Sequence, residues 1–114
     1  MQKDNAYLED IRLAAGRIAR YVEGMTQAEF LADEKTRAAV DREIAIMGEA
    51  ATKVSTGLKS DHGEVPWSRL VKLRNFYMHA YDRLSPSEVW GTAIRLAPHV
   101  SRLIARLIPD EAVE

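Results

Sequence analysis

Apolar residues recur at steps of three and four along most of this 114-residue chain. Such spacing places them on one face of an α-helix, whereas a half-buried strand needs strict alternation, and no segment shows that pattern. The apolar stripes run through residues 8–22, 40–54, 67–77 and 89–107. Each stripe must be buried against other helices. The sequence therefore predicts an all-α fold, an antiparallel bundle of four to five helices in a single domain spanning residues 1–114.

Two capping boxes mark helix starts. In "TQAE" at 26–29 and "SPSE" at 85–88, the first hydroxyl can accept from the backbone while the glutamate reaches back. The first box predicts a short second helix, after a first helix that ends near Gly24. The second box predicts the start of the last helix, which Pro98 should kink or divide because it removes a hydrogen bond.

The central helix is expected to be long, with an apolar stripe that reaches Val54 and with Gly57 beyond its end. Residues 59–66 are polar and lack periodicity, so they are predicted to form a connection, with Pro66 suited to the first turn of the next helix. That next helix must end between about Met78 and Leu84, before the second capping box.

Composition excludes several functions. The chain has no cysteine, so thiolate nucleophiles, disulfides and cysteine-based zinc sites are impossible, and its three separated histidines suggest no metal site or cofactor. The formal net charge of −1 gives no general basic field for nucleic acid, so any RNA contact must be local. No leader pattern or long apolar run is present, which makes a cytoplasmic location the expectation.

The segment "KLRNFYMHAY", residues 72–81, concentrates groups that can do chemistry. The imidazole of His79, with an ordinary pKa of about 6.5, can take a proton from a ribose 2′-hydroxyl or give one to a leaving 5′-oxygen. Arg74 offers planar donors to a phosphoryl group that gains charge, and Asn75 can bond to phosphate or orient the others. The alternative is a surface arginine and a histidine packed at a helix end.

The spacing of Arg74 and His79 restricts how they can converge. At about 100° per residue, the two side chains of a straight helix point about 140° apart. Convergence requires either that the helix ends near His79 or that two chains share the site across a two-fold axis. Both arrangements can hold together.

The segment "LRNFYMHAY" resembles the Arg-x4-His-x-Tyr motif of HepT-like toxins, a prokaryotic branch of the HEPN superfamily. "PW" at 66–67 stands upstream as in that family, and "AVDREIAIMGEAA" at 39–51 is similar to its long central helix. The resemblance implies an all-helical homodimer that cleaves RNA without metal. By position, Arg74 and His79 become the catalytic pair and Asn75 the supporting polar residue.

The resemblance also implies a partner. A small, MntA-like nucleotidyltransferase encoded beside the toxin acts as its antitoxin and transfers AMP to the motif tyrosine, here Tyr81. The expected function is therefore an endoribonuclease toxin neutralised by AMPylation. The alternatives are a catalytically silent HEPN-like module that binds a nucleotidyltransferase or nucleotide, and a Tyr81 that only packs its ring on the bundle.

Charged residues near the motif have two interpretations each. Glu49 is either an exposed helix carboxylate or a group that positions Arg74 from the facing helix. Four cations are either solvated helix charges or a basic rim near the motif: Lys53, Arg69, Lys72 and Arg83.

The remaining aromatic residues and histidines are not assigned to the site. Trp67 and Trp90 fall on apolar stripes and are predicted to be core residues. His62 is expected in a solvated connection, and His99 is expected to be a packing or surface residue.

Overall fold

The structure, a computed structural model, describes residues 2–78 and 84–109, and every regular element within them is helical. In chain order the elements are α1 (Gln2–Val22), α2 (Gln27–Ala32), α3 (Glu34–Lys53), α4 (Thr56–Asp61), α5 (Trp67–Met78), α6 (Pro86–Gly91), the π-helical turn η2 (Thr92–Leu96) and α7 (Ala97–Ala105). The predicted all-α bundle is confirmed. No helix of the described residues is both long and apolar enough to cross a membrane.

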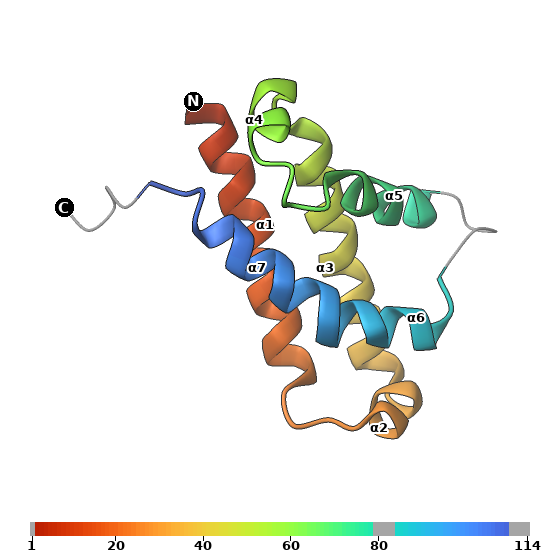
Figure 1. Cartoon of the computed structure of the whole chain (residues 1–114). Helices are drawn as coiled ribbons and strands as arrows, with labels where there is room; N and C mark the ends of the chain where they lie inside the picture. Colours follow the sequence, from red (N-terminus) through yellow and green to blue (C-terminus); the bar gives the residue numbers. More distant parts are fainter. Residues whose placement is uncertain (1, 79–83, 110–114) are drawn as a thin grey trace.

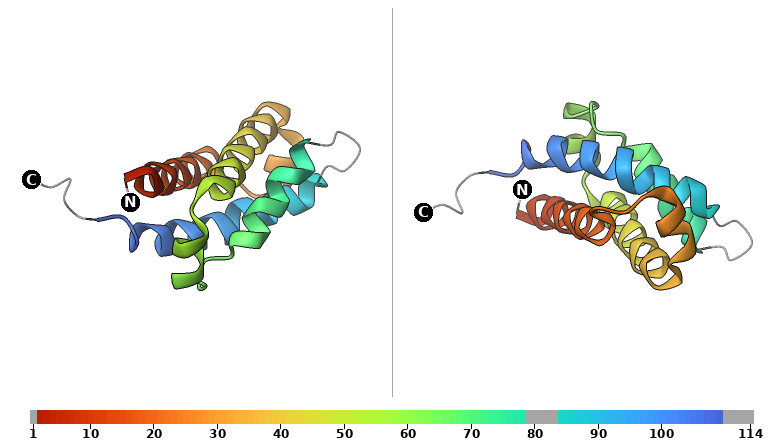
Figure 2. Two further views of the ribbon diagram at one scale, coloured as in Figure 1. Left: turned by 90° about the horizontal axis from the view of Figure 1, so that it is seen from above. Right: turned by 90° about the horizontal axis from the view of Figure 1, so that it is seen from below.

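The longer helices form two layers (Figures 1 and 2). In one layer α1 and α3 run antiparallel, and in the other α5 and the continuous unit α6–η2–α7 lie over them. The main contacts join α1 to α3, α3 to α5, and α1 to α7. Because α5 packs on α3, the motif helix and the central helix share an interface.

The predicted apolar stripes meet between these layers. The largest side chains of the core that are fully buried include Leu8, Ile11, Ile18, Phe30, Ile44, Met47, Leu70 and Ile104. A charged pair also joins α1 to α3. Arg17 Nε of α1 donates to Glu43 Oε1 of α3 at 2.8 Å, and Glu43 is buried. Pairing satisfies a carboxylate that would be costly to bury alone.

Both predicted capping boxes are present. The Glu29 N–H donates to Thr26 Oγ1 at 3.2 Å, and the Thr26 N–H donates to Glu29 Oε1 at 2.9 Å. Ser85 and Glu88 form the same two bonds at the start of α6. After α1, Gly24 adopts a φ of 76°, which an L side chain rarely allows, and this confirms the predicted stop.

The predicted long central helix is confirmed, and Gly57 lies beyond its end, but this glycine is not the residue that stops it. α3 ends at Lys53, and α4 covers part of the segment predicted to be a connection. Ser55 breaks the helix because its N–H and Oγ both donate to the Asp4 carboxylate, at 2.9 and 2.6 Å, while its Oγ accepts from the Leu58 N–H. Gly57 therefore lies inside α4 and does not stop the central helix.

The last helix is interrupted just before Pro98. The Ala97 N–H donates to the Thr92 carbonyl, an i to i−5 bond of π type, and η2 ends at Leu96. Pro98 has no N–H to give to the preceding turn, and a wider turn immediately before it lets the helix continue into α7. The kink or division expected at Pro98 is therefore a π turn that precedes the proline.

Candidate active site

Helix α5 carries the first half of the motif. It begins at Trp67, directly after Pro66, whose carbonyl accepts from the Leu70 N–H at 3.1 Å. Leu70 and Leu73 are buried, so α5 is fixed by its apolar side. Arg74 and Asn75 lie near the end of the described helix, whereas His79, Tyr81 and Arg83 lie outside the described residues.

The guanidinium of Arg74 is held by two neighbours. Its Nε donates to Glu49 Oε1 of α3 at 2.8 Å, and its Nη1 donates to Asn75 Oδ1 at 3.1 Å. The side chains of Arg74 and Glu49 are 31% and 44% exposed, so this pair lies at the surface edge of the α3–α5 interface. Of the two interpretations of Glu49, the contact with Arg74 is the one observed.

Gly48 explains why Arg74 comes so close to α3. A Cβ built at position 48 would lie 2.5 Å from Arg74 Cβ and 2.6 Å from the Leu70 carbonyl oxygen. Only glycine allows this approach, which places the base of Arg74 beside the residue that precedes Glu49 in the chain. Sequence reasoning overlooked Gly48, although a glycine inside a long helix usually has a packing reason.

Arg74 lines a cavity of about 360 Å³ between α1, α3 and α5, together with Arg42 and Lys53. Lys53 Nζ lies 3.8 Å from Glu49 Oε2 and 5.9 Å from the centroid of the Tyr7 ring. Glu49 is therefore shared by Arg74 and Lys53. Tyr77, also on this cavity, donates its hydroxyl to Asp41 Oδ1 at 2.9 Å and thereby ties the end of α5 to α3.

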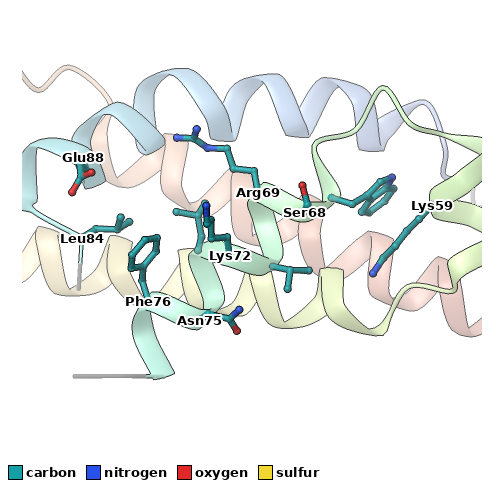
Figure 3. A pocket seen from close by; sticks show the side chains of 11 residues that line it. Lys59, Ser68, Arg69, Lys72, Asn75, Phe76, Leu84 and Glu88 are labelled. Atoms are coloured by element: carbon teal, nitrogen blue, oxygen red, sulfur yellow. The ribbon is translucent and has the colours of Figure 1, made fainter. Parts of the chain in front are cut away.

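The other side of α5 faces a second, larger cavity of about 760 Å³ (Figure 3). Asn75, Arg69 and Lys72 line it. The predicted basic rim is therefore not one group, because Lys53 lies with Arg74 on the first cavity while Arg69 and Lys72 lie on the second.

The residues left out of the site lie largely as predicted. Trp67 and Trp90 are buried, and the Trp67 Nε1–H donates to the His62 carbonyl at 2.9 Å. His62 lies in the connection between α4 and α5, as predicted, where it caps the C-terminal end of α4, and His99 is exposed on α7.

A helical bundle that fixes the arginine of an Arg-x4-His-x-Tyr sequence against its central helix defines the class of protein as a HEPN-type domain. A family model described as "Ribonuclease HepT-like" matches residues 11–107. The chain belongs to this HepT-like ribonuclease family, for which ribonuclease activity is the family-level function.

Curated relatives agree with this assignment. The chain is 35% identical to "Probable ribonuclease HepT" of Thermococcus cleftensis over 75% of the chain and 78% of the relative. Proteins named "Putative RNase" from Methanocaldococcus jannaschii and Caldanaerobacter subterraneus are 30% and 23% identical, over 92% and 97% of the chain and 87% and 99% of the relatives. No solved structure matches the chain.

Proposed function

We propose that this chain is an endoribonuclease toxin that cleaves RNA without a metal ion, with Arg74 and His79 as its catalytic pair. The observation that carries the proposal is the fixed guanidinium of Arg74. Nε and Nη1 are engaged by Glu49 and Asn75, and within the described residues Nη2 has no hydrogen-bond partner. One edge of a pre-oriented guanidinium is therefore left to meet a phosphate.

The reaction follows from these groups. The ribose 2′-oxygen loses its proton to an imidazole and forms a bond to the adjacent phosphorus, while Arg74 stabilises charge on the phosphoryl oxygens. The bond from phosphorus to the 5′-oxygen breaks, and that oxygen takes up a proton. The products are a 2′,3′-cyclic phosphate and a 5′-hydroxyl.

The proposal includes a homodimer. Arg74 and His79 of one straight helix would diverge by about 140°, and a two-fold axis would bring the motifs of two chains to one phosphate. In this arrangement Asn75 supports the site by holding Arg74 Nη1. Sedimentation at micromolar concentration should show a dimer, and a protein that is only monomeric would contradict this part.

The proposal also includes control by a small nucleotidyltransferase antitoxin. The phenolic oxygen of Tyr81 would attack the α-phosphorus of ATP, lose its proton and take AMP, while the bond to pyrophosphate breaks. The added phosphate brings negative charge to the motif, where it can occupy the donors of Arg74 in place of RNA. Modification would then stop cleavage without unfolding the chain.

Cleavage of a labelled RNA in excess chelator tests the proposal. The wild type should cut, and His79→Ala and Arg74→Ala should each lower the rate by roughly 10²–10⁴-fold. His62→Ala is the matched control, because it removes a partly exposed imidazole outside the motif and keeps the backbone carbonyl that binds Trp67. Full activity of either motif variant would overturn the catalytic assignment, and 5′-phosphate ends would overturn the mechanism. A folded wild type that binds a nucleotidyltransferase but never cuts RNA would favour the silent module instead.

A further inference from the structure

A long groove runs between α5 and the α6–η2–α7 unit. The cavity of about 760 Å³ adjoins another of about 400 Å³, and the two share Arg69, Leu73, Leu84 and Glu88 in their walls. The first reaches Lys59 of α4 and the second reaches His99 of α7. We call this combined feature the α5–α6 groove.

The α5–α6 groove is basic although the chain is not. Among the described residues, four cations line it: Lys59, Arg69, Lys72 and Arg95. No carboxylate within residues 2–78 and 84–109 forms an ion pair with any of them. Glu88 is the one acid among the groove's described lining residues, and its Oε1 already accepts from the Ser85 N–H. With a net charge of −1 for the whole chain, this excess of positive charge is local and suits a polyanion.

The floor of the groove is apolar. Val71, Phe76 and Leu84 are half-buried there, and Figure 3 shows Phe76 beside Leu84, with Arg69 extending toward the helix that forms the opposite wall. An apolar floor that includes the ring of Phe76, beneath a cationic rim, fits a single strand, because a base can stack on the ring while the phosphates meet the rim. A duplex keeps its base faces stacked inside the helix and could use only the rim.

The groove reaches the proposed active site through Asn75. Asn75 lines the groove and accepts a hydrogen bond from Arg74 Nη1. A strand bound in the groove would therefore be separated from Arg74 by this one side chain. On the opposite wall, Thr92 and Arg95 come from the π turn η2, a type of helix irregularity that is frequent at functional sites.

We propose that the α5–α6 groove is the binding site for single-stranded RNA. That this strand is also the one cleaved rests on the proposed function. The binding of RNA to the groove does not rest on the proposed function, because it requires the groove cations and the apolar floor but no catalytic step.

The test is binding of a fluorescently labelled single-stranded RNA, measured by anisotropy over a range of salt concentrations. All proteins carry His79→Ala so that the RNA stays intact. The groove variant adds Arg69→Gln, Lys72→Gln and Arg95→Gln. The control variant adds Lys3→Gln, Arg20→Gln and Lys35→Gln, which remove the same charge from exposed positions outside the groove.

The groove variant should bind at least about tenfold more weakly, with a slope of log K against log salt that is smaller by about 2, since each lost contact with a single strand removes about 0.7. The control should bind like the parent, and both should melt like the parent by circular dichroism. Phe76→Ala should weaken binding without changing the salt slope.

Three results would overturn the inference. They are equal weakening in the groove and control variants, equal affinity for a duplex of the same sequence, and loss of a dimer in sedimentation by the groove variant alone, which would assign the groove to a second copy of the chain. Cleavage by protein with His79 intact is measured in parallel. RNA that binds in the groove but is never cut would contradict the proposed function and leave the groove assignment standing.

Discussion

Gly48 of α3 lies against Arg74 of α5 so closely that a Cβ at position 48 would come within 2.5 Å of Arg74 Cβ. This contact sets the distance between the central helix and the motif helix. The Glu49–Arg74 hydrogen bond depends on that distance, because the two residues meet across the same interface.

Gly48→Ala should therefore destabilise the protein by about 1–3 kcal/mol, since the added methyl meets backbone that cannot move aside cheaply. Chemical denaturation measures this change. Gly16→Ala in α1 is the control, because its Cβ would have only Arg20 Nη1 nearby, at 4.0 Å. It should be neutral or stabilising by up to about 1 kcal/mol, as expected for alanine in a helix. Equal effects of the two substitutions would show that the close approach at Gly48 is unimportant.

Glu49→Ala should slow RNA cleavage by roughly 10²-fold, because Arg74 loses the group that orients it. Glu49→Gln keeps an acceptor for Nε and should recover part of the rate. The loss should fall mainly on kcat, and thermal stability should change little because this pair is partly exposed. Glu9→Ala, which removes the partner of Arg12 on α1, is the control and should cut normally. A Glu49→Ala enzyme with normal kcat would contradict the positioning role.

Tyr81→Phe should cut RNA at close to the wild-type rate but escape silencing by the antitoxin, because it has no phenolic oxygen to receive AMP. Co-expression followed by mass spectrometry checks this. Tyr21→Phe, at an exposed tyrosine of α1, should still be silenced. An AMP adduct mapped to another residue would show that Tyr81 is not the target.

Low pH should weaken the hydrogen bonds between Asp4 of α1 and Ser55, the N-cap of α4. Hydrogen bonds from the Ser55 hydroxyl and then from its N–H hold the pKa of Asp4 below its ordinary value. A carboxyl whose folded pKa is lowered adds stability above its unfolded pKa of about 3.9, and this is lost as pH falls through the lower folded pKa. Asp4→Asn should therefore be less stable than wild type at pH 7, with the gap closing toward pH 2. Unfolding curves across this range measure the gap, with Asp61→Asn at an exposed site as control. A gap independent of pH would show that the charge of Asp4 is not responsible.

Features set by neighbours in the chain could be predicted from the sequence. The capping boxes at Thr26 and Ser85 act within four residues, and both form as expected. The end of α3 could not be predicted in this way, because it depends on Asp4, 51 residues away from Ser55.

The candidate site likewise has features that the sequence predicts and features that depend on residues distant in the chain. Periodicity places Arg74 away from the apolar stripe of its helix, and the motif suggests its chemistry. Helical periodicity cannot say which residue of another helix lies opposite, so Glu49 had two interpretations until the packing of α5 on α3 was known. The cations near the motif divide between two cavities for a similar reason, because α5 itself separates them.

The contact at Gly48 also bears on how this sequence can drift over evolutionary time. A larger residue at position 48 would meet the Leu70 carbonyl as well as Arg74, and that backbone atom is present whatever residue occupies position 74. A descendant that has lost Arg74, and with it the reaction, would still need the glycine. The side chain of Glu49 is not required in this way, because within the described residues its carboxylate pairs only with the side chains of Lys53 and Arg74. Among diverging descendants, Glu49 and Arg74 should therefore disappear together while Gly48 persists, and the glutamate tells an active lineage from an inactive one better than the glycine does.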